Sequence, residues 1–266
     1  MSQQNQMRII VCIKQVPDTS QMKFDKETYS LIREGVPFMI NPFDENAIEA
    51  GLQIKEKHGG ELIVISMGAP QVAESLRHAI AMGADQAILL SDRRFALADT
   101  LATSYTLATA IKKIGGYNIL LFGKQSIDSD TAHVGPSVAE YLGLPQITYV
   151  KNISIDNGKI IAERVLEGYS EIVESTMPIV MTVAREINKP RHPSLKGVLK
   201  AKKAEIPVWT PETIDADINR IGKNGSATVV TGTFTPSLRG KNEIISGTAE
   251  EVAETLFSRL REQNLI

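Results

Sequence analysis

The stretch Tyr117-Asn-Ile-Leu-Leu-Phe-Gly-Lys-Gln-Ser-Ile-Asp-Ser-Asp-Thr131 joins a continuous apolar run to a loop of small and hydroxyl residues. The apolar part is typical of a parallel strand that is covered on both faces. A helix is expected to follow between residues 131 and 143, with first turns made irregular by Pro136. Because free N–H groups and the helix dipole favour a phosphate in front of a helix, the loop is a candidate diphosphate site. The same spacing also fits ordinary helix-start residues.

Strand and helix patterns alternate along the first 145 residues, and a fifth strand is expected to follow. Apolar runs rich in Ile, Leu and Val are separated by segments of helical period, and helices are expected to begin near Asp44, Pro70 and Asp99-Thr100. This alternation predicts an α/β domain whose mostly parallel sheet is joined by crossover helices, as in Rossmann-like folds. The expected strands cover residues 8–14, 61–67, 86–91, 117–123 and 146–150.

The pattern changes after residue 150. Residues 151–155 and 159–166 flank Asp156-Asn-Gly158, a turn sequence that predicts an added antiparallel hairpin. A last strand at 179–184 completes the expected nucleotide-binding domain of residues 1–184. The remaining residues, 185–266, are expected to form an extended C-terminal arm with a loose linker over 222–247 and an amphipathic end helix at about 248–263.

Charge and composition exclude several classes of partner. The 29 basic and 31 acidic residues give a net charge of −2, so no global field attracts nucleic acid or anionic lipid. No stretch approaches the roughly 20 apolar residues of a membrane span, and the polar first residues do not form an export signal. The lone Cys12 cannot form an intrachain disulfide, which fits a reducing compartment. We therefore expect a cytoplasmic protein that binds neither nucleic acid nor membrane.

The sequence lacks the common motifs of phosphate, metal and hydrolytic sites. It has neither G-x-G-x-x-G after a strand nor G-x-x-x-x-G-K-[ST], and it has no C-x-x-C, H-E-x-x-H or G-x-S-x-G motif. Four scattered histidines have no metal-ligand spacing. No catalytic residue and no metal ligand is therefore predicted.

Polar loops follow the first four predicted strands, at the edge where open parallel sheets bind ligands. In the last loop, Asp128 and Asp130 would repel a phosphate, so they either cap the helix or accept hydrogen bonds from ribose hydroxyls. Asn41 and Asp44 are interpreted first as helix caps, with recognition of an adenine edge as the alternative. His133 fits a structural residue better than a cofactor contact. The four loops cover residues 14–18, 67–70, 92–100 and 124–135.

Taken together, these loops resemble the β (small) subunit of electron-transferring flavoproteins over nearly the whole chain. Five short stretches carry the resemblance in the same order, and each is weak alone. The resemblance implies an adenine nucleotide alpha-hydrolase-like fold and an adenine-nucleotide site. The matching stretches are Val11-Cys-Ile-Lys-Gln-Val-Pro-Asp18, Asn41-Pro-Phe43, Ala81-Met-Gly-Ala-Asp85, Gly123-Lys-Gln-Ser-Ile-Asp128 and Pro190-Arg-His-Pro-Ser-Leu195.

The resemblance and the loop positions together define the expected site residues. An arm segment of about 188–204 is similar to the loop by which the family recognises its dehydrogenase partner, and its expected contact residues are His192, Pro193, Ser194, Leu195 and Lys196. The expected nucleotide-site residues are Cys12, Lys14, Asn41, Pro42, Phe43, Asp44, Met67, Gly68, Asp99, Thr100, Gln125, Ser126, Ile127, Asp128, Ser129, Asp130, Thr131, Ala132, His133, Val134, Gly135 and Pro136.

Two longer stretches resemble the NAD-linked, electron-bifurcating branch of the family. They are Asp130-Thr-Ala-His-Val-Gly-Pro136 and Asp92-Arg-Arg-Phe-Ala-Leu-Ala-Asp-Thr100. His133 stands where that branch usually has Gln, Leu97 where it has Gly, and Tyr169 also departs from the family pattern. In that branch the β subunit binds FAD, and NADH docks transiently beside it.

The resemblance implies a redox-active subunit rather than a self-contained enzyme. Electrons from NADH would pass to ferredoxin and, through the FAD of an α subunit, to a flavin-dependent dehydrogenase such as an acyl-CoA dehydrogenase-like enzyme or a lactate dehydrogenase. One alternative is a non-bifurcating β subunit that binds AMP as a structural ligand. Another is a stand-alone nucleotide-binding regulator of similar architecture.

Overall fold

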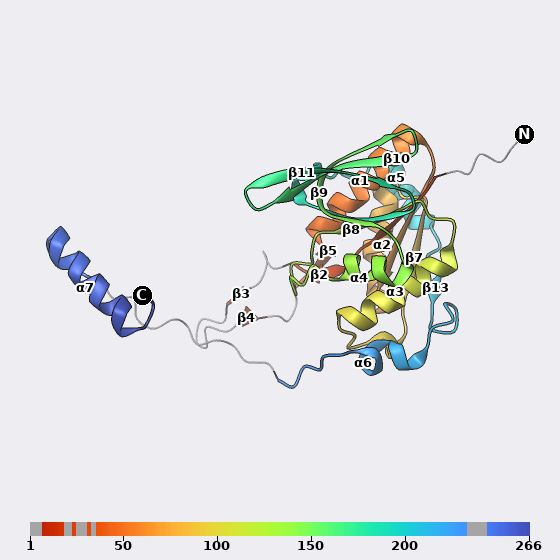
Figure 1. Cartoon of the computed structure of the whole chain (residues 1–266). Helices are drawn as coiled ribbons and strands as arrows, with labels where there is room; N and C mark the ends of the chain where they lie inside the picture. Colours follow the sequence, from red (N-terminus) through yellow and green to blue (C-terminus); the bar gives the residue numbers. More distant parts are fainter. Residues whose placement is uncertain (1–6, 19–22, 25–30, 33–35, 233–243) are drawn as a thin grey trace, which may run out of the picture. The chain divides into compact units, whose positions relative to one another are not determined.

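The structure is a computed structural model that describes residues 7–18, 23–24, 31–32, 36–232 and 244–266. It contains two compact units, Met1–Val229 and Val230–Ile266. The first unit holds all the strands that the structure describes and most of the helices (Figure 1).

The first unit is built on a nine-stranded sheet with the order β11-β10-β9-β12-β8-β1-β6-β7-β13. Its centre is parallel, as the sequence predicts, and the α/β fold class is confirmed. The five central strands are β12 (Ile179–Val183), β8 (Ile119–Gly123), β1 (Arg8–Cys12), β6 (Glu61–Met67) and β7 (Gln86–Leu90).

The first strand is shorter than the expected 8–14. After Cys12 the chain turns into β2 (Gln15–Pro17), which pairs antiparallel with β5 (Phe38–Ile40) outside the main sheet. A second small pair joins β3 (Lys23–Phe24) and β4 (Leu31–Ile32). The polar segment after β1 is therefore held by a pairing of its own.

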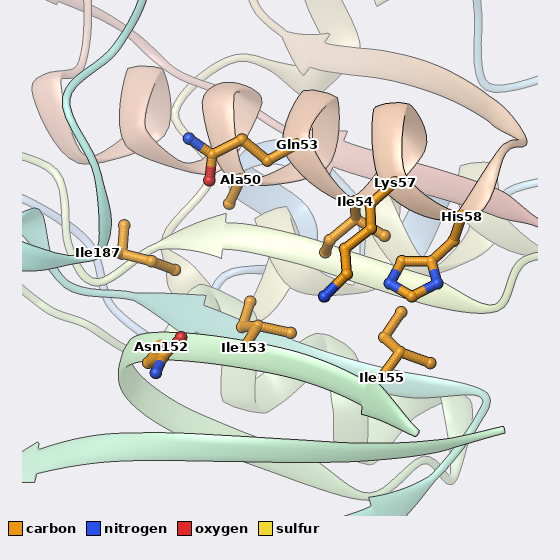
Figure 2. Close-up of a pocket in the computed structure, with 9 residues that line it drawn as sticks. All are labelled: Ala50, Gln53, Ile54, Lys57, His58, Asn152, Ile153, Ile155 and Ile187. Carbon is orange, nitrogen blue, oxygen red and sulfur yellow. The ribbon is translucent and has the colours of Figure 1, made fainter. Parts of the chain in front are cut away.

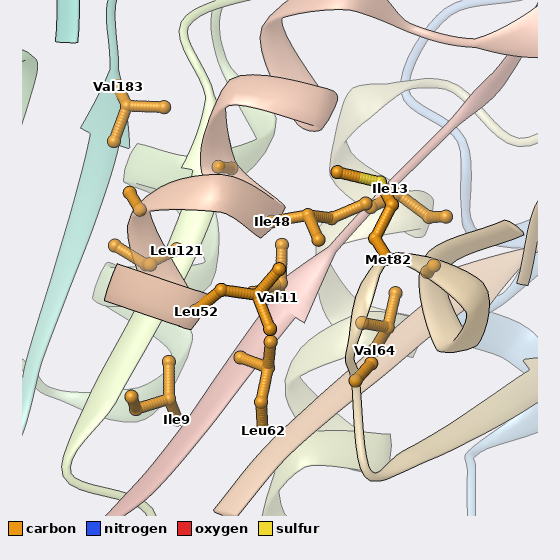
Figure 3. Close-up of a cluster of buried hydrophobic side chains, with 14 of the residues drawn as sticks. Ile9, Val11, Ile13, Ile48, Leu52, Leu62, Val64, Met82, Leu121 and Val183 are labelled. Carbon is orange, nitrogen blue, oxygen red and sulfur yellow. The ribbon is translucent and has the colours of Figure 1, made fainter. Parts of the chain in front are cut away.

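Helices cover both faces of the parallel strands, as the continuous apolar runs predict. Successive residues of β1 alternate between two buried clusters: Ile9 and Val11 pack with α1 and α2, whereas Ile10 and Cys12 pack with α3 and α4. Figure 3 shows Ile9 and Val11 against Ile48 and Leu52 of α1. The helices are α1 (Pro42–His58), α2 (Ala73–Met82), α3 (Thr100–Ile114) and α4 (Val134–Leu142), and short 3₁₀ turns occur at Pro70–Val72, Arg93–Phe95, Arg185–Ile187 and Ile218–Arg220.

The predicted hairpin is confirmed, and the structure extends it. Strand β9 (Gln146–Asp156) passes from a parallel pairing with β12 to an antiparallel pairing with β10 (Lys159–Leu166), and the register shifts once in each pairing. Asn157 and Gly158 both have positive φ values, 48° and 78°, as a tight hairpin turn requires. A further strand that the sequence analysis missed, β11 (Tyr169–Thr176), pairs antiparallel with β10 and forms the edge.

The compact unit continues past the expected boundary at residue 184, up to Val229. Helix α5 (Leu195–Lys203) packs on α2, and β13 (Val208–Trp209) adds a parallel edge strand beside β7. Ile214 and Ile221 are buried in the cluster under α3. The part of the expected linker before residue 226 includes the short helix α6 (Gly222–Gly225), whereas residues 233–243 lie outside the described part. Single buried residues at irregular spacing give no periodic signal, so the sequence did not indicate this packing.

The second unit contains the predicted end helix, α7 (Ala249–Glu262). Thr248 and Glu251 form a capping box at its start, in which each side chain bonds the other residue's backbone N–H. Leu256 and Phe257 are exposed on this helix. Among the residues that the structure describes, no helix combines the length and apolar character needed to cross a membrane.

Candidate functional site

The strand order places a topological switch point between β1 and β8. From β1 the chain proceeds to β6 and β7 on one side, and it then returns to β8 on the other side. Connections from the carboxyl ends of such a strand pair diverge to opposite faces and leave a crevice, where open α/β sheets bind ligands. The β1 exit loop (residues 13–18) and the β8 exit loop (residues 124–133) begin at this point.

Asp44 joins these two strand ends. It lies in the first turn of α1 and is 6% exposed, and its Oδ2 accepts a hydrogen bond of 2.7 Å from the N–H of Lys14. Its Oδ1 accepts a second bond, of 3.1 Å, from the N–H of Gly123. The interpretation of Asp44 as a helix cap is therefore wrong, because the carboxylate faces neighbouring strand ends instead of its own helix.

Asn41 makes a second connection between the loops, because its N–H donates to the carbonyl of Lys14 in the β1 exit loop at 2.9 Å. Its side chain is buried, donates to the carbonyl of Gln125 at 2.8 Å and accepts from the N–H of Ile127 at 3.2 Å. Asn41 occupies the position before α1, yet its side chain makes no capping bond, and Pro42 starts the helix. The capping interpretation is wrong for Asn41 as well, because its side chain bonds the β8 exit loop instead of the N–H groups of the first helical turn.

Burial raises the pKa of Asp44 to about 7, although the N–H of Lys14, the side chain of Asn41, the N–H of Gly123 and the charge of Lys14 lower it. Burial also raises the pKa of the Cys12 thiol well above its usual range, and the neighbouring charge of Asp44 raises it further. Cys12 is 5% exposed at the end of β1, so it is a buried neutral thiol beneath the crevice.

The β8 exit loop has internal hydrogen bonds and a bridge to the β1 exit loop. Lys14 Nζ lies 2.7 Å from Asp128 Oδ2. The hydroxyls of Ser126 and Ser129 lie 2.8 Å apart, and Gln125 Nε2 donates to Asp130 Oδ1 at 2.8 Å. Neither aspartate caps α4, whose preceding residue is His133 without a side-chain capping bond. Asp128 and Asp130 thus stabilise the loop that connects β8 to α4.

The backbone at the end of this loop suits an anion. Asp130 and Ala132 have positive φ values, 49° and 55°, and His133 is right-handed helical. Consecutive residues of opposite hand turn their N–H groups towards one side, which is the arrangement of anion-binding nests. The following first turn of α4 adds N–H groups without intrahelical partners. With the hydroxyls of Ser126, Ser129 and Thr131 nearby in the chain, this donor set fits a diphosphate.

Asp99 and Thr100 have a different role in the structure. Asp99 Oδ1 caps α3 through the N–H groups of Leu101 and Ala102, and Oδ2 accepts from the N–H and hydroxyl of Thr228. Both carboxylate oxygens of Asp99 therefore accept hydrogen bonds from groups of the protein. The starts of α3 and α4 are nevertheless neighbours, because Ser104 Oγ lies 3.4 Å from the carbonyl oxygen of Val134.

The remaining expected nucleotide-site residues lie around the same edge. Met67 ends β6, and Gly68 donates to the carbonyl of Leu90 at 3.0 Å. Phe43 lies beside Gly123, and His133 is exposed. Bonds and ion pairs connect the β1 and β8 exit loops, whereas the loop containing Asp99 is bonded to residues 226–228.

The expected partner-contact residues lie at and before the start of α5. Ser194 caps this helix by accepting from the N–H of Gly197 at 3.0 Å, and Leu195 is 80% exposed. Arg191 ties the segment to α1 through Glu49, with Nε 2.7 Å from Oε2, and through Glu56. Leu195 is thus exposed to solvent on a segment that Arg191 bonds to α1.

Several contacts near this edge of the sheet could not be predicted from the sequence. Lys124 donates its N–H to the carbonyl of Val183 and places its ammonium 5.1 Å from the ring centre of Tyr149. Arg94 pairs with Asp92 and with Glu212, which is 118 residues away. Except for the pairing of Arg94 with Asp92, these contacts join segments that are distant in sequence, so only the fold reveals them.

Two cavities lie away from this edge. One of about 160 Å³ is formed between α1 and β9, with Ile54, Ile153 and Ile155 beside Lys57 and His58 (Figure 2). Another of about 440 Å³ lies between α2, the start of β7 and the end of α5. Neither is lined by an expected nucleotide-site residue. Within the described part of the chain, no group of three or more His, Cys, Asp or Glu side chains could hold a metal ion.

The sheet order and the loops at its switch point define an open α/β protein of the class that binds ligands at strand carboxyl ends. Residues 28–214 match the family model described as electron transfer flavoprotein domain. The chain therefore belongs to the electron transfer flavoprotein family, and its relatives align it with the β subunits.

Full-length relatives support this placement. The chain is 47% identical over 261 residues to the electron transfer flavoprotein subunit beta of Thermoanaerobacterium thermosaccharolyticum, covering 98% of this chain and 100% of the relative. It is 47% identical over 262 residues to the caffeyl-CoA reductase-Etf complex subunit CarD of Acetobacterium woodii, with coverages of 98% and 100%. Identity to the protein FixA of Bradyrhizobium diazoefficiens is 42% over 262 residues, with coverages of 96% and 91%.

Proposed function

We propose that this chain is the β subunit of a cytoplasmic, electron-bifurcating electron transfer flavoprotein and that it binds FAD at the carboxyl ends of β1 and β8. The observation that carries the proposal is the connection of the β1 and β8 exit loops at the switch point of the sheet through Asp44, Asn41 and the Lys14–Asp128 pair. The choice of FAD over AMP rests on residues 92–100 and 130–136, which resemble the bifurcating branch.

Different residues at this edge would bind different parts of the nucleotide. The N–H groups around Ala132 and His133, together with the first turn of α4, would hold the diphosphate. The hydroxyls of Ser126, Ser129 and Thr131 would donate to phosphate oxygens, and Asp130 would accept from a ribose hydroxyl. Cys12, Met67 and Phe43 supply the apolar surface nearby. No side chain is required as an acid or base.

When bound, FAD would supply the redox chemistry, which is the transfer of electrons from transiently bound NADH to ferredoxin and to the FAD of the α subunit. The chain's own residues would fix the position of the nucleotide and limit access to it.

The dehydrogenase would dock on the segment at the start of α5, with exposed Leu195 as the apolar anchor. This segment consists of His192, Pro193, Ser194, Leu195 and Lys196. Similarity to a subunit of a caffeyl-CoA reductase-Etf complex favours an acyl-CoA dehydrogenase-like partner over a lactate dehydrogenase.

The test is the cofactor content of this chain co-purified with its α subunit. We expect two FAD per αβ pair by visible spectroscopy, and we expect limited NADH to bleach flavin absorbance without acceptors, with the absorbance recovering once ferredoxin and the dehydrogenase are added. Ser126→Asp places a negative charge in the diphosphate loop, so this variant should keep one FAD per pair. Ser170→Asp, on the exposed part of edge strand β11, is the matched control and should keep two.

Other results would identify the alternatives. One FAD with one AMP released on denaturation would contradict bifurcation and indicate a β subunit with a structural nucleotide. A chain that purifies alone as a stable monomer or homodimer, and that captures no α subunit, would indicate a stand-alone regulator instead.

A further inference from the structure

A single carboxylate connects the ends of two neighbouring parallel strands. Asp44 Oδ2 accepts from Lys14 at the exit of β1, and Oδ1 accepts from Gly123 at the end of β8. The two donors are backbone N–H groups 109 residues apart, because 123 − 14 = 109. Since β1 and β8 pair directly, the carboxylate lies at the point where their exit loops separate.

The contact is closely packed on the side of β8. A Cβ atom at position 123 would lie 2.3 Å from Asp44 Oδ1 and 2.7 Å from Phe43 Cβ. Residue 123 must therefore be glycine for its N–H to reach the carboxylate. The first turn of α1 thus approaches the end of β8 too closely for a side chain at position 123.

Nothing in the helix itself requires a buried carboxylate at this position. The helix starts with Pro42, and Asp44 makes no bond to the free N–H groups of its own first turn. Burying a carboxylate is costly, and burial raises the pKa of Asp44 accordingly. Its bonds to Lys14 and Gly123 restrain the loops on either side of the crevice. Asn41 adds to this restraint, because its N–H donates to the carbonyl of Lys14 and its side chain bonds Gln125 and Ile127.

We propose that Asp44 is a positioning residue that fixes the separation of the β1 and β8 exit loops and so holds residues 125–130 in place to receive the nucleotide. Both of its oxygens are engaged by the protein, so Asp44 acts through the loops and does not contact the nucleotide. This inference deepens the proposed function and rests on it.

The test compares Asp44→Asn with the wild type in the αβ pair after nucleotide removal, at about pH 8, where the carboxylate is ionised. Asn keeps one acceptor, but its NH₂ group faces the second backbone N–H, so one of the two bonds is lost. Glu74→Gln removes an exposed carboxylate from the first turn of α2 and is the matched control. The thermal unfolding midpoint shows that each variant is folded.

We expect hydrogen exchange in peptides covering residues 123–130 to be about tenfold faster in Asp44→Asn, and the dissociation constants of added AMP and FAD to rise by about tenfold. Glu74→Gln should match the wild type in both measurements. Gly123→Ala should have a similar effect, because its Cβ displaces the same carboxylate. In a double-mutant cycle, the second substitution should add little to the first.

Three results would overturn the inference: unchanged loop exchange in Asp44→Asn, faster exchange with unchanged AMP and FAD affinity, or fully additive effects of Asp44→Asn and Gly123→Ala. A wild-type pair that binds neither AMP nor FAD would contradict the proposed function itself. Normal wild-type binding with unchanged loop exchange in the variant would contradict only the role of Asp44.

Discussion

At the scale of single residues, Asn41 and Asp44 illustrate what a sequence pattern leaves undetermined. Both precede or begin a helical segment, and short polar residues at such positions usually cap the helix. The structure places their acceptors on the amides of Lys14, Gly123 and Ile127, which are far away in the chain. The preference of Asn and Asp for helix starts predicted where α1 begins. The hydrogen-bond partners of Asn41 and Asp44 depend instead on how α1 packs over β1 and β8.

The raised pKa of Asp44 predicts a pH dependence of stability. The carboxyl titrates near 3.8 in the absence of perturbation and near 7 in the folded chain, so between these values the folded state binds more protons. The contribution of Asp44 to stability therefore falls as pH rises from about 4 to about 7, and it is constant above that range. Asp44→Asn removes this titration. The thermal midpoint of the wild type should fall relative to that of the variant over this window, and a constant difference would refute the prediction.

Gly135 gives a second prediction at this scale. An added Cβ would lie 2.6 Å from Thr182 Cγ2 and 3.4 Å from the side chain of Phe122, so α4 packs on the sheet without space for alanine. Gly135→Ala should destabilise the folded chain by about 1–3 kcal/mol. Gly232→Ala, with no atom near the added carbon, should change stability by less than about 0.5 kcal/mol. Equal thermal midpoints for the two variants would contradict the packing argument.

At the scale of elements, α1 carries two functions along its 17 residues. Its first turn restrains the exit loops, and its later turns hold the segment before α5. Arg191 bonds Glu49 through Nε at 2.7 Å and Nη2 at 2.9 Å, and Asn46 donates to the carbonyl of Asn188 at 2.9 Å. The Glu49 carboxylate is 5% exposed, so it depends on Arg191 for its charge partner.

Arg191→Ala should leave the Glu49 charge buried without its partner and destabilise the fold by roughly 3 kcal/mol. Hydrogen exchange over residues 188–203 should accelerate, and the dehydrogenase should bind more weakly because the segment with Leu195 is no longer fixed. Arg191→Lys should recover only part of the effect, since an ammonium cannot make the two-pronged contact. Arg185→Ala, at an exposed residue, is the control. Unchanged exchange in Arg191→Ala would show that the segment is held by other contacts.

The elements that the sequence predicted are those with strong periodicity. The central strands consist of Ile, Leu and Val runs, and α7 begins with the residues of a capping box. Strand β11 alternates exposed and half-buried residues and includes Glu171 and Glu174, so it lacks the apolar run of a buried strand. Strand β13 has two residues and pairs only at the edge of the sheet, which is too short for any pattern.

At the scale of the whole molecule, the position of the candidate site follows from the topology. Alternating strands and helices predict a parallel sheet, and a parallel sheet with a switch point has a crevice at that point. The loops after β1 and β8 could therefore be nominated from the sequence. Their connection through Asp44, Asn41 and Lys14 could not, because it depends on contacts between segments that are 30 to 114 residues apart.

The central claim is that the exit loops of β1 and β8 enclose the adenine-nucleotide part of a redox cofactor. The most direct measurement is the crystal structure of the αβ pair with its bound cofactors. The account predicts density for an FAD diphosphate against residues 125–136, with Asp44 still bonded to Lys14 and Gly123. A nucleotide bound elsewhere on this chain, or exit loops collapsed onto each other with no space for an adenylate, would contradict it.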